Sequence, residues 1–261
     1  MQVAHIAPIA GLPLIKGKPV QFVIAPYVEK YPAYASFYKN EKGYKIIDNG
    51  AWELRKPMSP TKYLKIAVDV GADEIILPDY EFKPVHTLAR TREFINLLRT
   101  EQHEHSFNYQ LVLHGRDYFD MVDRASWLIC EIRKMKFEIN RLGIPLYNKD
   151  WTGRIMAVYL LRQKQTLLQN LTFHLLGLHD PIELMCYGNE VHSVDCRYAF
   201  KYGITLTDWY IQNPLPIIHR FDMRVEWSQT NTQKIKLHMY MIEKLARRGE
   251  KDVTLLQSDH R

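Results

Sequence analysis

The stretch from Tyr44 to Asp79, YKIIDNGAWELRKPMSPTKYLKIAVDVGADEIILPD, decides the fold class. It opens and closes with short apolar runs, at 44–48 and 74–79, of the kind that forms buried parallel strands. Between them, residues 60–70 have helical spacing, with Ser59 placed to cap the helix and Pro60 in its first turn. The stretch therefore predicts a strand, a helix and a second strand, the repeating unit of parallel α/β folds.

The same alternation continues along the chain. Strands are predicted at 21–26, 109–114, 173–178 and 191–195, and helices at 86–98, 118–142, 153–169 and 181–188. The chain has 261 residues, 46% of them hydrophobic, which suits one large core. We expect one domain over residues 1–261: a (β/α)8 TIM-type barrel with its core at about 20–220 and a C-terminal amphipathic helix at about 231–249. An open doubly wound sheet is the alternative.

Composition narrows the functional classes only a little. The 35 Lys and Arg exceed the 29 Asp and Glu, and a net charge of +6 permits binding to a polyanion without specifying it. The three cysteines form no C-x-x-C pair, which favours reduced thiols. Apolar runs are much shorter than the ~20 residues of a membrane span, and the N-terminus lacks a signal-peptide pattern, so we expect a cytoplasmic protein.

Polar residues and turns follow the predicted strands where each strand ends. The carboxyl ends of barrel strands share one face, and an open parallel sheet also binds ligands at that edge. We therefore expect residues distant in sequence to converge on one pocket. These are Asp48, Asp79, His114, the turn Leu176-Gly177-Leu178, and Asp195.

Two of the carboxylates suit chemistry on a purine nucleotide. Asp79 follows an apolar strand and could accept N–H bonds from N1 and the exocyclic amine of guanine, although a helix cap or a salt bridge would also explain it. Asp195 could stabilise or capture the positive charge that develops at C1′ when a glycosidic bond breaks. Asp48 could act near the base, or it could merely cap an Asx turn.

Asp48-Asn49-Gly50-Ala51 resembles the Asp-Ser-Gly-Gly signature of tRNA-guanine transglycosylases. It is more similar to the Asp-Asn-Gly-Ala form of the phage and bacterial DNA 7-deazaguanine transglycosylases, and the likeness covers about residues 20–200. The resemblance implies Asp195 as nucleophile and Asp48 as general acid/base or support. It implies a base-binding group made of Asp79, His114, Leu176, Gly177, Leu178, Asn49, Gly50 and Trp52, with Trp52 or Tyr80 stacking on the base.

The resemblance implies a DNA guanine transglycosylase that flips a deoxyguanosine out of the stack and exchanges its guanine for a 7-deazaguanine such as preQ0. The intermediate would be a covalent Asp-deoxyribose ester. The resemblance then implies the 7-deazaguanine base as co-substrate, with no other cofactor required. It implies DNA as the partner and no contact with a membrane. DNA modification of this kind suits a bacteriophage evading restriction in the cytoplasm of its bacterial host.

The chain departs from the tRNA enzymes in two respects. After Asp195 only Cys196 remains of their C-x-C-x-x-C and His zinc motif, so we expect no structural zinc and no other metal. His114 stands where a glutamine contacts the base. A tRNA-guanine transglycosylase acting on RNA, a non-catalytic nucleic-acid-binding barrel and a hydrolase of small nucleosides remain as alternatives.

Several basic residues are candidates for phosphate contacts. For those on the C-terminal helix, the alternative is that the helix closes the barrel with an apolar stripe and leaves its lysines in water. Arg197 could instead form an ion pair that orients Asp195. The candidates are Arg197, Arg154, Lys234, Lys236, Arg247 and Arg248. His174, His179 and His192 match no common metal-ligand spacing and are expected to be satisfied or exposed histidines.

Overall fold

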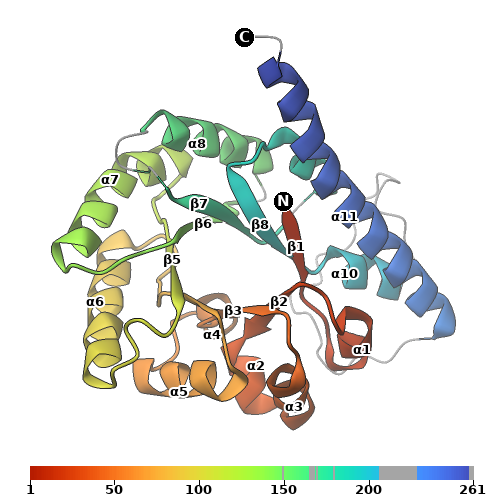
Figure 1. Cartoon of the computed structure of the whole chain (residues 1–261), viewed down its shortest axis with the longest axis horizontal. Coiled ribbons are helices and arrows are strands. Elements are labelled where there is room, and N and C mark those ends of the chain that lie inside the picture. The colour runs from red at the N-terminus through yellow and green to blue at the C-terminus, as the bar shows by residue number, and fades with distance from the viewer. Residues whose placement is uncertain (149, 165–167, 169, 179, 206–227, 259–261) are drawn as a thin grey trace.

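The fold is an eight-stranded, all-parallel, nearly closed barrel surrounded by helices (Figure 1). The computed structural model describes the chain except residues 149, 165–167, 169, 179, 206–227 and 259–261, and it does not describe the side chains of 203–205, 230 and 248–258. The strands are β1 (Gln2–His5), β2 (Val20–Ile24), β3 (Tyr44–Asp48), β4 (Glu74–Ile76), β5 (Asn108–Val112), β6 (Arg141–Pro145), β7 (Thr172–Leu176) and β8 (Val191–Cys196). This confirms the predicted TIM-type class.

The strand order around the barrel is β1-β8-β7-β6-β5-β4-β3-β2, and every neighbouring pair is parallel. β1 and β2 end this order and lie side by side in Figure 1. The ring of helices comprises α1 (Leu12–Ile15), α2 (Ala25–Lys30), α3 (Pro32–Asn40), α4 (Ala51–Leu54), α5 (Pro60–Val70), α6 (Pro84–Thr100), α7 (Tyr118–Lys134), α8 (Trp151–Gln163), η2 (Pro181–Cys186), α10 (Tyr198–Thr205) and α11 (Gln229–Ser258), with η1 (Ile9–Gly11) before α1. Strands buried on both faces explain the continuous apolar runs in the sequence.

The core has two layers. A large cluster fills the space between strands and helices, and a smaller one inside the barrel includes Phe22, Ile46 and Val112. Polar side chains also enter the barrel, where Arg141 Nη1 lies 2.8 Å from Glu74 Oε2. Burial of these charges is tolerated because they are paired.

Two strands and two helix ends differ from the sequence predictions. β1 and β6 were not predicted, and the expected helix at 118–142 is wrong because α7 ends at Lys134. Lys136 has a φ of 54°, which turns the chain out of the helix before β6. α8 likewise ends at Gln163, short of the expected 169. Helical spacing of apolar residues continued across both ends, so periodicity alone did not mark them.

The C-terminal helix α11 packs on α10, η2 and β1 and is longer than the predicted 231–249. Its apolar stripe of Ile235, Met239 and Ile242 is buried. Glu243 joins the helix to the barrel by accepting hydrogen bonds from His5 Nε2 at 3.0 Å and Lys18 Nζ at 2.6 Å. α11 is therefore a closing helix over the described part of its length.

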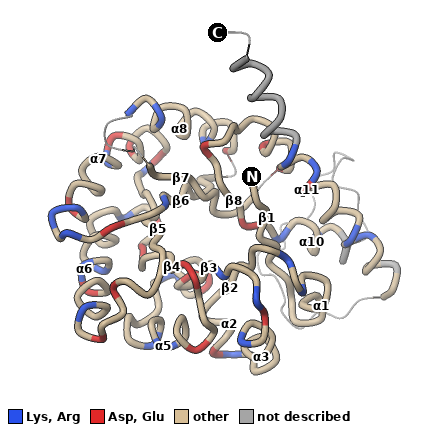
Figure 2. The backbone as a smooth tube through the Cα atoms, viewed as in Figure 1, with Lys and Arg blue, Asp and Glu red and all other residues tan. Residues whose placement is uncertain are grey.

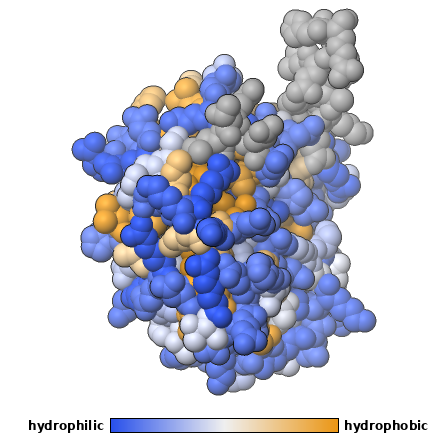
Figure 3. Space-filling model, turned by 60° about the vertical axis from the view of Figure 1, so that its left-hand side comes forward, coloured by the Kyte–Doolittle hydropathy of each residue, from blue (hydrophilic) through white to orange (hydrophobic). Residues whose placement is uncertain are grey.

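Charged residues are spread widely over the molecule. Figure 2 shows basic and acidic positions alternating around the ring of helices. The face turned forward in Figure 3 is mainly hydrophilic, with separate apolar patches between the charged side chains. In the part of the chain that the structure describes, no helix combines the length and the apolar character needed to cross a membrane.

Candidate active site

The turn after β3 places the first carboxylate at the carboxyl end of the barrel. Asp48 is the last residue of β3 and is half-buried, and its Oδ1 accepts the Gly50 N–H at 3.1 Å. Gly50 has a φ of 73°, and a Cβ there would come within 2.2 Å of Pro26 Cγ. Only glycine fits this position. The Asx turn considered for Asp48 is therefore present, and it leads directly into α4.

The second carboxylate is held at both oxygens. Asp79 Oδ1 accepts Asn49 Nδ2 at 2.8 Å, and Oδ2 lies 2.7 Å from His114 Nε2. Tyr147 Oη lies 3.5 Å from Nδ1 of the same histidine. Asp79 is 8% exposed and His114 is 3% exposed. Each carboxylate oxygen has a second lone pair, so Asp79 can still accept N–H groups from a ligand. His114 directs one nitrogen at Asp79, which departs from a purely base-contacting role.

The third carboxylate belongs to Asp195 on β8. Its Oδ1 accepts the Gly177 N–H at 2.8 Å and lies 3.2 Å from His174 Nε2. Ser193 Oγ lies 2.8 Å from the other nitrogen of that histidine, and Phe22 stacks on the imidazole ring with 5.8 Å between centroids. Oδ2 makes no hydrogen bond with any residue that the structure describes. One oxygen of Asp195 is thus fixed by two contacts, and the other has no hydrogen-bond partner among the described residues.

The turn after β7 is built to support Asp195. Gly177 has a φ of 73°, a conformation that glycine adopts without strain. The half-buried Leu176 ends β7, and the Leu178 N–H donates to the Asp195 carbonyl at 3.1 Å. The predicted turn and the predicted nucleophile are therefore neighbours in space, joined by two hydrogen bonds.

Arg154 corrects one prediction. Its side chain is fully buried, so it does not present its guanidinium to a nucleic-acid phosphate. It makes two bonds of 2.7 Å to the Glu183 carboxylate and donates to the carbonyls of Leu176 at 3.0 Å and Gly177 at 2.8 Å. A bidentate pair of this kind stabilises a buried guanidinium. Arg154 therefore stabilises the turn that holds Asp195.

The three aspartates lie at the carboxyl ends of their strands: Asp48 ends β3, Asp79 follows β4 and bonds to Asn49, and Asp195 lies near the end of β8. Burial raises the pKa of Asp48 well above its usual range, and the negative charges of Glu53, Asp79 and Asp195 raise it further. The Gly50 N–H acts in the opposite direction and stabilises the ionised form. Like charges that shift one another's protonation must lie close together. The fold thus brings Asp48, Asp79 and Asp195 to one end of the barrel, as the sequence predicted.

Glu53 is a member of this group that the sequence analysis missed. Burial raises its pKa and the charge of Asp195 adds to the rise, whereas a hydrogen bond from its own backbone N–H and the charges of Arg197 and Arg55 oppose it. Its Oε2 is buried and has no hydrogen-bond partner among the described residues. The signal was available, since Glu53 comes two residues after the Asp48-Asn-Gly-Ala motif.

The remaining predicted contacts are distributed over the surface. Arg197 is half-buried, Lys236 and Arg247 are exposed, and Lys234 is half-buried on α11. The side chain of Arg248 lies outside the described residues. Trp52 is 48% exposed, and the Arg55 guanidinium lies 4.6 Å from the centre of its ring. Tyr80 is half-buried.

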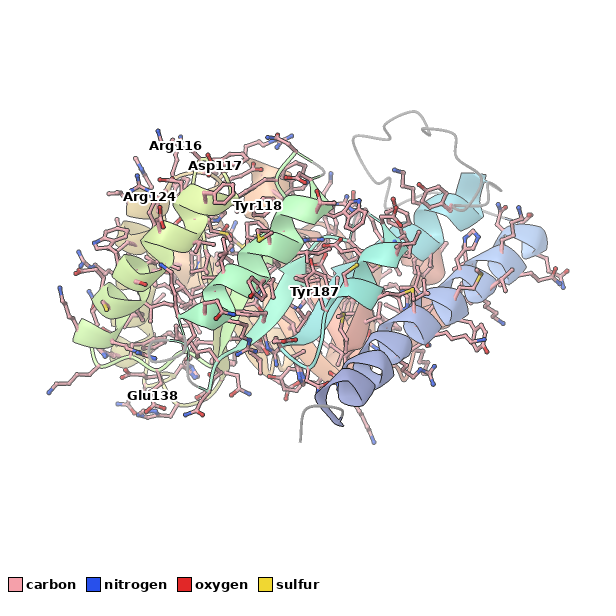
Figure 4. All side chains as sticks on the ribbon, turned by 90° about the horizontal axis from the view of Figure 1, so that it is seen from above. Arg116, Asp117, Tyr118, Arg124, Glu138 and Tyr187 are labelled. Atoms are coloured by element: carbon pink, nitrogen blue, oxygen red, sulfur yellow. The ribbon has the colours of Figure 1, made fainter. Side chains whose placement is uncertain are left out.

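The two ends of the barrel differ in character. Figure 4 shows Arg116 and Asp117 at the end that carries the three aspartates and Glu138 at the opposite end. A shallow pocket near Glu138, lined by Arg133, Phe137 and Asn140 among others, is remote from those carboxylates.

In the described part of the chain, no three His, Cys, Asp or Glu side chains are grouped to hold a metal ion. His192 is exposed, and His179 lies outside the described residues.

A scan of the chain against protein-family models gives no match, and a search of curated proteins finds no relative. The assignment of function therefore depends on the geometry of the site and on the motifs in the sequence.

Proposed function

We propose that this protein is a guanine transglycosylase that exchanges guanine in DNA for a 7-deazaguanine base such as preQ0. The observation that carries the proposal is the convergence of Asp48, Asp79 and Asp195 at the catalytic end of a barrel, with Asp195 fixed through one oxygen only. Two hydrogen bonds hold Oδ1, so Oδ2 can attack C1′ from a defined direction.

Asp79 supports recognition of guanine. Its oxygens are oriented by Asn49 and His114, and each retains a lone pair toward a ligand. Guanine presents N–H groups at N1 and at its amine, which a carboxylate accepts, whereas adenine presents an acceptor at N1. The 7-deazaguanines carry the same edge, so one pocket serves the leaving and the incoming base.

Asp195 supports covalent exchange over simple binding. In the proposed reaction its Oδ2 forms an ester with C1′ while the bond from C1′ to guanine N9 breaks, and the incoming base then displaces the ester. His174 and the Gly177 N–H stabilise the ionised carboxylate both before attack and on release. A barrel that only bound nucleic acid would not need one carboxylate oxygen fixed and the other left available.

DNA is proposed over tRNA on two features of the sequence. The motif Asp48-Asn49-Gly50-Ala51 is closer to the DNA enzymes, and the zinc motif of the tRNA enzymes is missing after Asp195. Arg197 supports a contact with the phosphate next to the exchanged nucleotide. It lies two residues from Asp195 and is half-buried, and its positive charge acts on Glu53 in the same site.

The test is release of labelled guanine from DNA or tRNA on addition of preQ0. We expect release from DNA, and a protein–DNA adduct that survives denaturant in the absence of an incoming base. Release from tRNA alone would transfer the assignment to the RNA enzymes. Binding of DNA without release from either polymer would favour the non-catalytic barrel, and release from free deoxyguanosine alone would favour a nucleoside hydrolase.

A further inference from the structure

Glu53 is an acidic side chain beside the aspartates of the candidate site to which the proposed exchange reaction assigns no role. It lies in α4, immediately after the turn that carries Asp48 and Asn49. Its Oε2 is shielded from solvent and lacks a hydrogen-bond partner among the described residues. An ionised carboxylate in that position would leave a buried anionic oxygen unsatisfied, which is costly. A protonated Glu53 avoids that cost.

The exchange reaction needs a group that can hold one proton between its two halves. When guanine leaves C1′, the electron pair of the broken bond goes to the base, which must gain a proton to leave as a neutral molecule. When the 7-deazaguanine enters, its N9 must lose a proton as it forms the new bond. One proton is therefore given in the first half of the reaction and recovered in the second, with no net change.

We propose that Glu53 carries this proton, an inference that rests on the proposed exchange activity. In the first half, Asp195 Oδ2 bonds to C1′, the bond from C1′ to N9 breaks, and Glu53 gives its proton to a ring nitrogen of the departing guanine. In the second half, Glu53 takes the N9 proton of the incoming base, N9 bonds to C1′, and the ester electron pair returns to Asp195. Atoms and charges balance over the cycle.

The surroundings of Glu53 favour it over Asp48 for this role. Both carboxyls accept a backbone N–H that favours the ionised form, from Gly50 for Asp48 and from its own main chain for Glu53, but of the two only Glu53 has a buried oxygen, Oε2, without a hydrogen-bond partner in the described structure. The charged and titratable groups that face Glu53 are Asp48 on β3, Asp195 on β8, Arg197 after β8, Arg55 at the end of α4 and Tyr27 on α2.

The test compares the wild type with Glu53→Gln in single-turnover release of guanine and of 7-methylguanine from DNA. Glutamine keeps the size of the side chain but cannot transfer a proton. 7-Methylguanine is cationic in DNA and leaves as a neutral base without being protonated, and a pocket that accepts 7-substituted preQ0 has room for the methyl group. We expect E53Q to slow guanine release by about 100-fold or more, the usual contribution of a general acid. Release of 7-methylguanine should be unchanged.

The matched control is Glu81→Gln. Glu81 is a half-buried carboxyl near the same end of the barrel, and burial raises its pKa too, but it has no role in the proposed reaction. E81Q should release guanine at the wild-type rate. The pH profile gives an independent readout: wild-type release should fall as pH rises through the raised pKa of Glu53, because the acid form is lost. E53Q should lack that fall.

If E53Q slows the release of guanine and of 7-methylguanine equally, or keeps the wild-type pH profile, Glu53 has a structural role only. If E53Q does not fold, the infrared band of a protonated buried carboxyl in the wild type at neutral pH, assigned by labelled glutamate, decides whether a proton is stored. Its absence overturns the inference. Failure of the wild type to release guanine from DNA or tRNA would instead overturn the proposed function itself.

Discussion

Replacing Glu183 by glutamine should reveal how strongly the catalytic end depends on a buried ion pair. Glu183 and Arg154 are both fully buried, and the carboxylate accepts two bonds of 2.7 Å from the guanidinium and one of 2.7 Å from Tyr187. Glutamine preserves the shape but leaves the positive charge of Arg154 without a counter-charge. We expect a loss of about 3–5 kcal/mol in the free energy of unfolding.

This loss should be visible as a lower melting temperature. For a chain of this size, 1 kcal/mol corresponds to about 2 °C, so E183Q should melt about 6–10 °C below the wild type in circular dichroism. The control is Glu131→Gln, which removes exposed ion pairs with Arg92 and Lys134 and should leave the melting temperature nearly unchanged. Equal losses in E183Q and E131Q would refute the assumption that the buried pair is energetically distinct.

The double variant Arg154→Met, Glu183→Met separates stability from positioning. Removing both charges should recover most of the stability, because an apolar pair of similar volume replaces a desolvated one. The carbonyls of Leu176 and Gly177 would still lose their two donors. Exchange should then fall on the order of 100-fold, the effect of a displacement of about 1 Å at a reacting group. Full exchange activity in this variant would show that the turn holds Asp195 without Arg154.

Three further predictions concern single residues. Asp195→Asn should abolish both exchange and the denaturant-resistant adduct, and adduct formation by this variant would exclude Asp195 as nucleophile. Asp79→Asn should mainly impair the choice of base, so base preference in release assays should weaken; an unchanged preference would reject its role. Burial alone would raise the pKa of Glu243, but hydrogen bonds from His5 and Lys18 outweigh it and lower this pKa to about 2 from 4.5. The stabilisation is thus complete above pH 4.5 and is lost as pH falls toward 2, and Glu243→Gln should remove this part of the acid dependence in urea titrations.

The sequence located the end of the barrel at which the three aspartates gather. Asp48, Asp79 and Asp195 each follow a run of apolar residues, and in a parallel barrel the carboxyl ends of all strands lie on one face. Periodicity also gave α5 its observed bounds, Pro60–Val70. It missed β6 because the apolar spacing of α7 continues into the strand, and it missed β1 because a four-residue strand carries little periodic signal.

The partners of the site residues came only from the tertiary structure. Arg154 resembled a surface arginine at the start of a helix, yet it is buried against Glu183, 29 residues further along the chain. His114 was expected to meet the base, yet one of its nitrogens meets Asp79. His174, expected to be satisfied or exposed, lies beside Asp195.

The physical reason is that strand ends and hydrophobic periods are local properties, written in consecutive residues. The sequence by itself therefore determined the parallel barrel and the end at which its polar residues gather. Hydrogen-bond partners depend on strand register and on distances of a few ångströms between segments far apart in the chain, which local patterns do not encode. The tertiary structure alone decided that Gly177 and His174 hold Asp195, that Arg154 holds the turn, and that Glu53 stands among the aspartates.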